Sequence, residues 1–151
     1  MDNNNDIWVF LSHSNKDYEK VREIRNLLEE QNFRPLMLFL KCLNDEEEID
    51  SLIRREIDSR KRFILCDSPN AQSSKWVQKE VDYIKSKQRY WYTLNLGESS
   101  EKIAQSILQF AGESTVYISY SRNDEALYEQ LKTMLYDDLD LRVFDLKNDI
   151  L

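Results

Sequence analysis

Glycine and histidine are scarce in this sequence, and their scarcity excludes several kinds of site. Only Gly97 and Gly112 occur among the 151 residues, and neither belongs to a GxGxxG or GxxxxGK[ST] pattern. The chain therefore lacks the glycine-rich loops that hold dinucleotides in Rossmann folds and phosphates in P-loops. His13 is the single histidine, so a Ser-His-Asp triad or a histidine-rich metal site has one ring at most to draw on. We expect no metal site.

Cysteine, positive charge and long apolar runs are also in short supply. Cys42 and Cys66 are too few for a disulfide framework and have no metal-ligand spacing, so both are predicted to be free thiols. The formal net charge of −7 gives no basic surface for nucleic acid or anionic lipid. No apolar run approaches the roughly 20 residues that span a bilayer, and the polar start MDNNND does not resemble a signal peptide. These absences predict a cytoplasmic protein with no nucleic-acid or membrane partner.

What the sequence does contain is an alternation of apolar strands with amphipathic helices. The run DIWVFLSHS at 6–14 predicts a first strand, and Ser14 offers an N-cap to a helix that reaches about Gln31. Further strands are predicted at 34–40, 62–68, 89–96, 114–121 and 141–146. Further helices are predicted at 49–57, 73–84, 99–111 and 124–137, with polar loops at 41–48 and 68–74.

This alternation predicts an α/β fold, a flavodoxin-like doubly wound parallel sheet of about five strands with helices on both faces. Ligands of such sheets bind beyond the carboxyl ends of the strands, near the point where the strand order reverses. The rim formed there is predicted to comprise residues 12–16, 41–46 and 67–75. We assign residues 1–138 to this domain and residues 139–151 to a C-terminal extension or an extra edge strand.

One stretch of the sequence occurs twice in outline. FLSHSNKD at 10–17 and YISYSRND at 117–124 share two serines and an aspartate at matching positions, and each precedes an amphipathic helix and a strand. Because a hydroxyl cap and an acidic first turn are common wherever a strand leads into a helix, we favour a later strand that completes the main sheet. The alternative is that residues 115–151 begin a second, similar domain.

A tryptophan and a glutamate lie one helical turn apart in SSKWVQKEVDYI, residues 73–84. Trp76 and Glu80 are i and i+4, so they share a face of the helix beside its predicted apolar stripe of Val77, Val81 and Ile84. The helix follows the third strand directly, which places its start at the carboxyl rim. The pattern alone predicts a solvated Glu80 and edge packing for Trp76.

Taken together, these segments resemble the Toll/interleukin-1 receptor (TIR) domain family, and its bacterial members in particular. The resemblance rests on the first strand ending FLSHSNKD, on RPLMLFLKCL with the loop after it, on RFILCDS, and on WVQKE as the WxxxE motif. It covers most of residues 6 to about 138. It implies a TIR fold and an enzyme that cleaves NAD+ at the nicotinamide-ribosyl bond, as a glycohydrolase or cyclase, with NAD+ as the substrate and no cofactor.

The resemblance also implies roles for particular residues. Glu80 is then the catalytic carboxylate, which orients the ribose hydroxyls and stabilises the positive charge of an oxocarbenium-like transition state. Trp76 forms an apolar wall beside it. The loop after the first strand contacts the dinucleotide through Ser12, His13 and Lys16, with the lysine as a point charge for the pyrophosphate.

The loop after the second strand corresponds to the family's segment that opens or closes over the site and mediates self-association. Its residues expected near the ligand are Cys42, Leu43 and Asp45. The proline-glycine pair often found in this loop is missing from the sequence. The resemblance further implies TIR–TIR contacts between copies, an immune signal in bacterial antiphage defence, and a downstream effector that senses the nucleotide product.

Two other classes of function share this fold. A non-catalytic interaction module, or adaptor, uses the 41–46 loop and the acidic helix after it as a contact surface and has no need of a carboxylate at position 80. A phosphoacceptor domain of the response-regulator type needs paired acidic residues at the end of the first strand, where this chain has Ser12 and His13. We therefore keep the adaptor as the alternative and rank the phosphoacceptor last.

Overall fold

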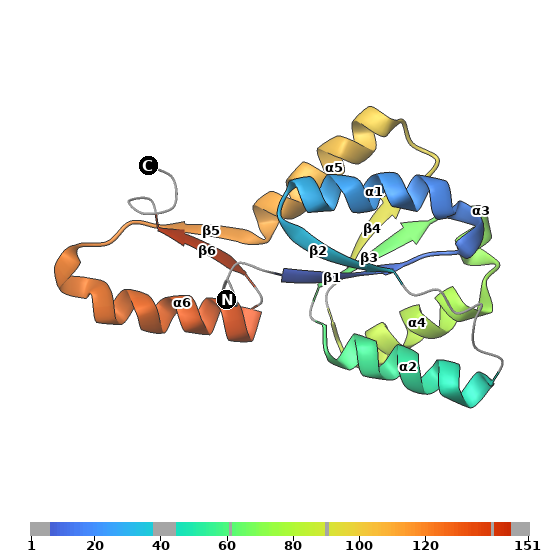
Figure 1. The fold of residues 1–151 in the computed structure, drawn as a ribbon, viewed down its shortest axis with the longest axis horizontal. Coiled ribbons are helices and arrows are strands. Elements are labelled where there is room, and N and C mark those ends of the chain that lie inside the picture. The colour runs from blue at the N-terminus through green and yellow to red at the C-terminus, as the bar shows by residue number, and fades with distance from the viewer. Residues whose placement is uncertain (1–6, 38–44, 61, 90, 140, 146–151) are drawn as a thin grey trace.

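The computed structural model describes residues 7–37, 45–60, 62–89, 91–139 and 141–145, and it places a parallel sheet between two layers of helices, with a smaller unit at one end (Figure 1). The main sheet has four strands in the order β2-β1-β3-β4, all parallel. They are β1 (Ile7–Ser12), β2 (Phe33–Met37), β3 (Arg62–Asp67) and β4 (Trp91–Asn95). The chain builds outward from β1 on both sides, which confirms the predicted α/β, doubly wound class.

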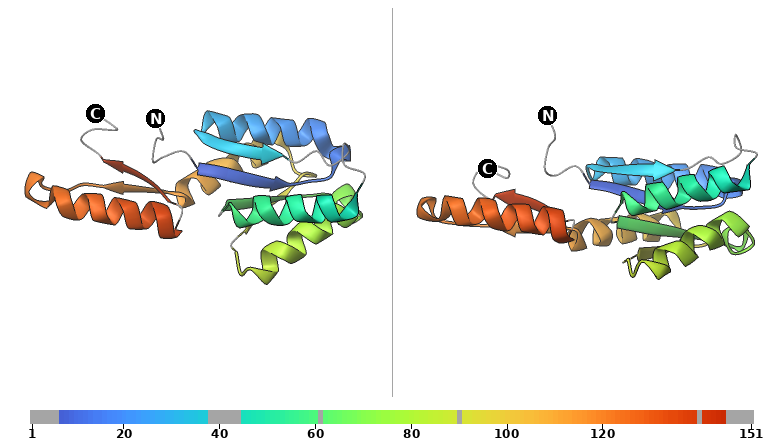
Figure 2. Two further views of the ribbon diagram at one scale, coloured as in Figure 1. Left: turned by 60° about the horizontal axis from the view of Figure 1, so that its bottom comes forward. Right: turned by 90° about the horizontal axis from the view of Figure 1, so that it is seen from below.

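Helices cover both faces of this sheet. α1 (Tyr18–Glu30) and α5 (Ser100–Glu113) pack on one face, and α2 (Glu46–Asp58) and α4 (Lys75–Ser86) pack on the other (Figures 1 and 2). Val9 and Leu11 belong to the apolar core under α1 and α5, whereas Phe10 belongs to the core under α2 and α4. Burial on both faces explains why β1 has a continuous apolar run instead of alternation. None of the helices that the structure describes has both the length and the apolar character that a bilayer crossing requires.

Two short helical turns shape the carboxyl rim. Ser14 caps a 3-10 turn, η1 (Asn15–Asp17), instead of capping α1 itself as predicted. The stretch 68–74, predicted as a loop, contains a four-residue helix, α3 (Pro69–Gln72), which Ser68 caps. These turns hold short polar side chains at the rim, because a capping hydroxyl is fixed by the backbone N–H that it binds.

The fifth strand does not complete the main sheet. Among the described residues, β5 (Thr115–Ile118) pairs in parallel with β6 (Arg142–Asp145), and η3 (Arg122–Asp124) and α6 (Glu125–Leu139) connect them. The prediction that β5 joins the main sheet is therefore wrong. A single residue, Ser114, separates α5 from β5, so the chain has no loop in which to turn back beside β4. It runs on from α5 and away from the main sheet (Figure 1).

A buried arginine fastens this C-terminal unit, residues 115–145, to the main domain. Arg142 donates from Nη1 to the carbonyl of Gln31, the residue that follows α1. Its Nη2 donates to Oγ1 of Thr115 at 3.0 Å, and its guanidinium lies 4.1 Å from the centroid of the Phe33 ring. One side chain thus joins β6 to β5, to the end of α1 and to the start of β2.

Replacing Arg142 by alanine is expected to lower the free energy of unfolding by about 2–3 kcal/mol, because it removes a ring contact and leaves two acceptors without their donor. Native-state hydrogen exchange should quicken in β5 and β6 while β1 and β3 keep their protection. Arg22→Ala, at an exposed position of α1, is the control and should change the free energy by less than about 0.5 kcal/mol. An equal loss of protection in both sheets would contradict the anchoring role.

Candidate active site

The carboxylate of the WxxxE motif lies in the interior of the protein. Glu80 is on the sheet-facing side of α4 with 4% of its surface exposed, although the pattern alone predicted a solvated residue. The buried residues of α4 are Val77, Glu80 and Ile84, so the predicted stripe is wrong at Val81, which is half-buried. Trp76, one turn earlier, packs at the edge of the same core. The glutamate thus takes a core position, and the tryptophan lies one turn nearer the start of the helix.

Burial raises the pKa of Glu80 to about 8. The hydroxyl of Ser12, at the end of β1, opposes this rise in pKa in part, although it forms no hydrogen bond of standard geometry among the described residues. The side chain of Glu80 is therefore mainly protonated in the folded protein at neutral pH. A carboxyl whose pKa is raised by burial at the rim of a parallel sheet is typical of functional sites.

The end of β1 supplies a run of buried polar side chains, Ser12, His13 and Ser14. His13 donates from Nδ1 to the carbonyl of Leu11 at 3.2 Å. Burial lowers the pKa of His13, and the contact with Leu11 and the charge of Asp17 only oppose this. The imidazole is therefore neutral at pH 7, so it contributes hydrogen bonds to the site and no positive charge.

Asp17 joins the loop after β1 to the loop after β3. Its carboxylate accepts hydrogen bonds from Oγ of Ser68 at 2.5 Å and from Nδ2 of Asn70 at 2.8 Å. Because Ser68 also caps α3, this aspartate fixes η1 against the start of α3. No local pattern predicts the link, since its partners lie 51 and 53 residues further along the chain.

An open cavity of about 410 Å³ lies between these loops and the start of α4. It is lined by Ser14, Asn15, Lys16, Asn70, Ser73, Ser74, Lys75 and Trp76. Two lysines and the amino end of a 12-residue helix give the cavity a positive potential, and one indole gives it an apolar wall. Its volume is within the range of small-molecule sites. The structure thus brings the predicted contacts Lys16 and Trp76 together and adds Asn70 and Lys75, which the sequence did not indicate.

Glu80 lies one turn along α4 from Trp76, a residue that lines this cavity. Trp76 lines the cavity, whereas Glu80 and Ser12 do not. Two ammonium groups lie near the indole of Trp76, with Nζ of Lys75 at 4.7 Å and Nζ of Lys79 at 4.9 Å from the ring centroid. A ligand in the cavity therefore contacts Trp76, and Glu80 follows Trp76 by one turn of α4.

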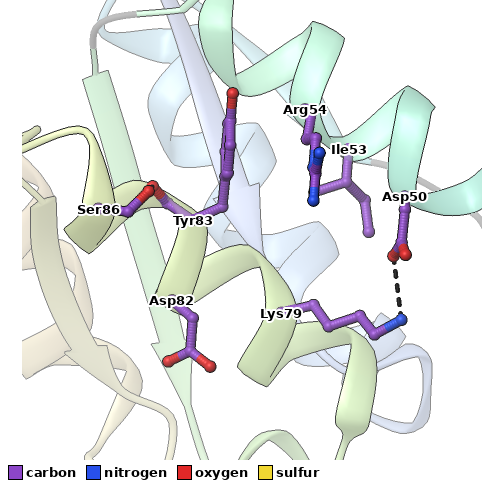
Figure 3. A pocket seen from close by; sticks show the side chains of 7 residues that line it. All are labelled: Asp50, Ile53, Arg54, Lys79, Asp82, Tyr83 and Ser86. Atoms are coloured by element: carbon purple, nitrogen blue, oxygen red, sulfur yellow. Dashed lines mark hydrogen bonds and ion pairs between the residues drawn. The ribbon is translucent and has the colours of Figure 1, made fainter.

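A separate groove of about 320 Å³ runs between α2 and α4 (Figure 3). Lys79 crosses it and donates to Oδ1 of Asp50 at 3.0 Å and to Oε1 of Glu46 at 3.1 Å. Nζ of Lys75 lies 3.5 Å from the same oxygen of Glu46. These ion pairs hold the first turn of α2 against α4 and fix both lysines beside Trp76. The groove combines acidic and basic side chains, so it presents no single charge to a ligand.

The remaining predicted contacts fall in or beside the loop after β2. Asp45 is exposed, caps α2 by accepting from the backbone N–H of Glu47 at 2.9 Å, and does not line the cavity. Cys42 and Leu43 lie outside the described residues. Cys66 is a free, buried thiol, as predicted. Within the described ranges no group of three His, Cys, Asp or Glu side chains is placed to hold a metal ion.

Comparisons with known proteins agree with the resemblance seen in the sequence. The family described as TIR domain matches residues 9–107, from β1 into α5. Among solved structures, the chain is similar to the CMP N-glycosidase BcmB of Clostridium botulinum, at 13% sequence identity and a TM-score of 0.43, over 91% of this chain and 85% of that chain. No curated protein matches the chain significantly.

Glu80→Gln is expected to raise the free energy of unfolding at pH 7, by on the order of 3 kcal/mol, because the amide keeps the shape of the side chain without its ionisation. The pKa of Glu80 in the folded protein, about 8, lies above the ordinary value of 4.5, so the wild type loses stability as the pH rises between these values. The gain in the variant should therefore vanish near pH 4, as urea unfolding at several pH values will show.

Asp82→Asn, at an exposed position on the same helix, is the matched control and should leave stability unchanged. If Glu80→Gln and the wild type were equally stable at pH 8, the carboxyl would not be held in a buried, neutral form.

Proposed function

Because this chain belongs to the TIR domain family, we propose that it is an NAD+-consuming enzyme, a glycohydrolase or cyclase, with Glu80 as its catalytic carboxylate. The observation that carries the proposal is a buried carboxyl of raised pKa, one turn along α4 from a tryptophan that lines a cavity with two lysines. NAD+ suits both features, because its pyrophosphate is anionic and its nicotinamide ring is cationic. The anionic pyrophosphate is attracted by Lys16, Lys75 and the start of α4. The cationic nicotinamide ring is attracted by the ionised form of Glu80.

The reaction breaks the bond between C1′ of the ribose and the ring nitrogen of nicotinamide. The electron pair of this bond leaves with nicotinamide, which becomes neutral and needs no proton. Positive charge develops on the ribose, and an ionised Glu80 stabilises it in a site shielded from water. Capture of C1′ by water, with loss of a proton, gives ADP-ribose, and capture by a nucleophile of the same molecule gives a cyclic product.

Glu80 has to lose its proton before it can act in this way. With a pKa of about 8 it is mainly neutral in the free protein at pH 7. A cation placed against a carboxyl lowers the pKa of that carboxyl, so the nicotinamide ring itself favours the ionised form. Substrate binding and ionisation of Glu80 are therefore coupled, and we assign to Ser12 and His13, the neutral polar side chains buried at the end of β1, the role of orienting the ribose hydroxyls.

The wider role follows from the family resemblance. We propose that the nucleotide product is an immune signal in bacterial antiphage defence, made in the cytoplasm and sensed by a downstream effector. TIR–TIR contacts between copies then complete or activate the site.

One observation favours the alternative of a non-catalytic interaction module. The carboxyl of Glu80 does not line the cavity and has 4% of its surface exposed, which suits a purely structural role. In that case the charged outer surface of α2, beginning at Glu46, is the contact surface. Turnover of NAD+ separates the two functions.

Purified protein incubated with NAD+ is expected to release nicotinamide, measured by chromatography. Glu80→Gln should lower the rate by about 10²-fold or more, because it removes the charge that stabilises the transition state. Asp82→Asn also replaces a carboxylate by an amide on α4, but at an exposed position. The rate of this control variant should equal that of the wild type. Equal rates for all three proteins would exclude Glu80, and the absence of release by any of them at high concentration would favour the interaction module.

The rate of NAD+ cleavage at low substrate is expected to rise with pH and to level off above an apparent pKa of about 8, because only the ionised form of Glu80 is active. The profile of kcat/KM against pH measures this pKa in the free enzyme. Asp82→Asn should reproduce the wild-type profile. A rate that falls as the pH rises through 8 would assign Glu80 the role of an acid in place of a charge stabiliser.

A further inference from the structure

The two lysines that line the cavity differ in what surrounds their ammonium groups. Nζ of Lys75 lies 3.5 Å from Oε1 of Glu46, the first residue of α2, and has no other carboxylate partner in the described part of the chain. Lys16, on η1, forms no ion pair with any carboxylate that the structure describes. The cavity thus presents one lysine without a counter-ion and one lysine that has a counter-ion.

One oxygen of Glu46 serves two lysines of α4. Oε1 accepts a hydrogen bond from Nζ of Lys79 at 3.1 Å and is also the oxygen that lies close to Lys75. Lys79 has a second partner, Asp50, whose Oδ1 accepts at 3.0 Å (Figure 3). Of the two lysines, only Lys75 lines the cavity. Because Lys79 has two carboxylates and Lys75 has one, Glu46 determines whether the charge of Lys75 is neutralised.

A second contact keeps Lys75 at the cavity when its ion pair is broken. Its Nζ lies 4.7 Å from the ring centroid of Trp76, which lines the same cavity, and an indole ring attracts a cation placed near it. The ammonium group can therefore leave Glu46 and remain beside the cavity wall. The first turns of α2 also stay in place, because Lys79 still joins α4 to Asp50.

We propose that Glu46 controls the affinity of this cavity for phosphate as a competing counter-ion, so that a phosphate group gains the full charge of Lys75 only when Glu46 releases it. The ligand is the nucleotide pyrophosphate of the proposed function, on which this role of Glu46 rests. Carboxylate and phosphate oxygens compete because both are anionic acceptors for the same ammonium group. Glu46 does not line the cavity, so it acts through Lys75 and is a positioning residue.

The exposure and charge of the ion pair determine how strongly Glu46 competes. The side chains of Lys75 and Glu46 are 66% and 62% exposed, and ion pairs at such positions are weak. The pKa of Glu46 is lowered by its hydrogen bond with Lys79 and by the charge of Lys75, so its carboxylate is ionised at neutral pH. A ligand with one carboxylate equals Glu46 in charge and gains little by replacing it. A pyrophosphate carries more charge and has Lys16 as a further cation in the cavity.

The test is calorimetric titration of the full chain with inorganic pyrophosphate, at neutral pH and low salt, where charges are little screened. Glu46→Gln is expected to lower the dissociation constant about three- to fivefold, because it frees Lys75 from an exposed ion pair. Glu48→Gln is the matched control. It removes the same charge from an exposed position on the opposite side of α2, and it should change the dissociation constant by less than about 1.5-fold.

The Lys75→Gln variant measures whether Glu46 acts through this lysine. Alone it should weaken pyrophosphate binding, and Glu46→Gln should have no further effect in the Lys75→Gln background. Circular dichroism establishes that each variant is folded. Equal or weaker binding by Glu46→Gln would overturn the proposal, as would the same gain in affinity with and without Lys75. The absence of pyrophosphate binding by every variant would overturn it as well.

Turnover of NAD+ separates the role of Glu46 from the proposed enzymatic activity. If the chain cleaves NAD+, Glu46→Gln should lower KM about three- to fivefold and leave kcat unchanged, because it alters binding and not the reacting bond. Turnover with the same KM in both proteins would overturn the role of Glu46 and leave the enzyme standing. Tighter pyrophosphate binding by Glu46→Gln without any turnover would support the role of Glu46 and contradict the enzyme.

Discussion

Burial of β1 on both faces is the constraint on which the rest of the main domain depends. Val9, Phe10 and Leu11 have 0–1% of their surface exposed, and β2 and β3 occupy both edges of the strand. Parallel neighbours require long crossovers, and the helices in these crossovers are what covers the two faces. Because all four strands point the same way, the loops after β1 and β3 meet at one rim. There Asp17 links them, and α4 begins beside the link.

The sequence predicts the elements of this domain well because the signals are local. Apolar runs, helical spacing and serine caps each depend on a few neighbouring residues, and the structure confirms the strands and helices they indicate. The burial of Glu80 is different. At 3.6 residues per turn, both positions 80 and 81 lie within reach of the core between Val77 and Ile84, and packing against the end of β1 decides that the glutamate faces inward. Only the family resemblance pointed to this residue, and it did so without predicting its burial.

The contacts that shape the site are also the ones least visible in the sequence. Asp17 finds its partners on α3 and just before it, and Lys75 and Lys79 find theirs on α2. The sequence pattern also does not predict the course of β5, because that course depends on the length of the connection between α5 and β5. A strand after α5 suits the main sheet by pattern, but a one-residue link cannot reverse the chain.

The segment FLSHSNKD at 10–17 is repeated in outline as YISYSRND at 117–124, so the folding chain has two candidates for the central strand of the main sheet. β1 and β5 each lead through a serine-capped turn into a helix and a parallel partner strand. During synthesis β1 emerges first, so β2 and β3 occupy both of its edges before β5 is made. A chain diluted from denaturant has no such order, and there the greater length of β1, six residues against four, favours the native pairing.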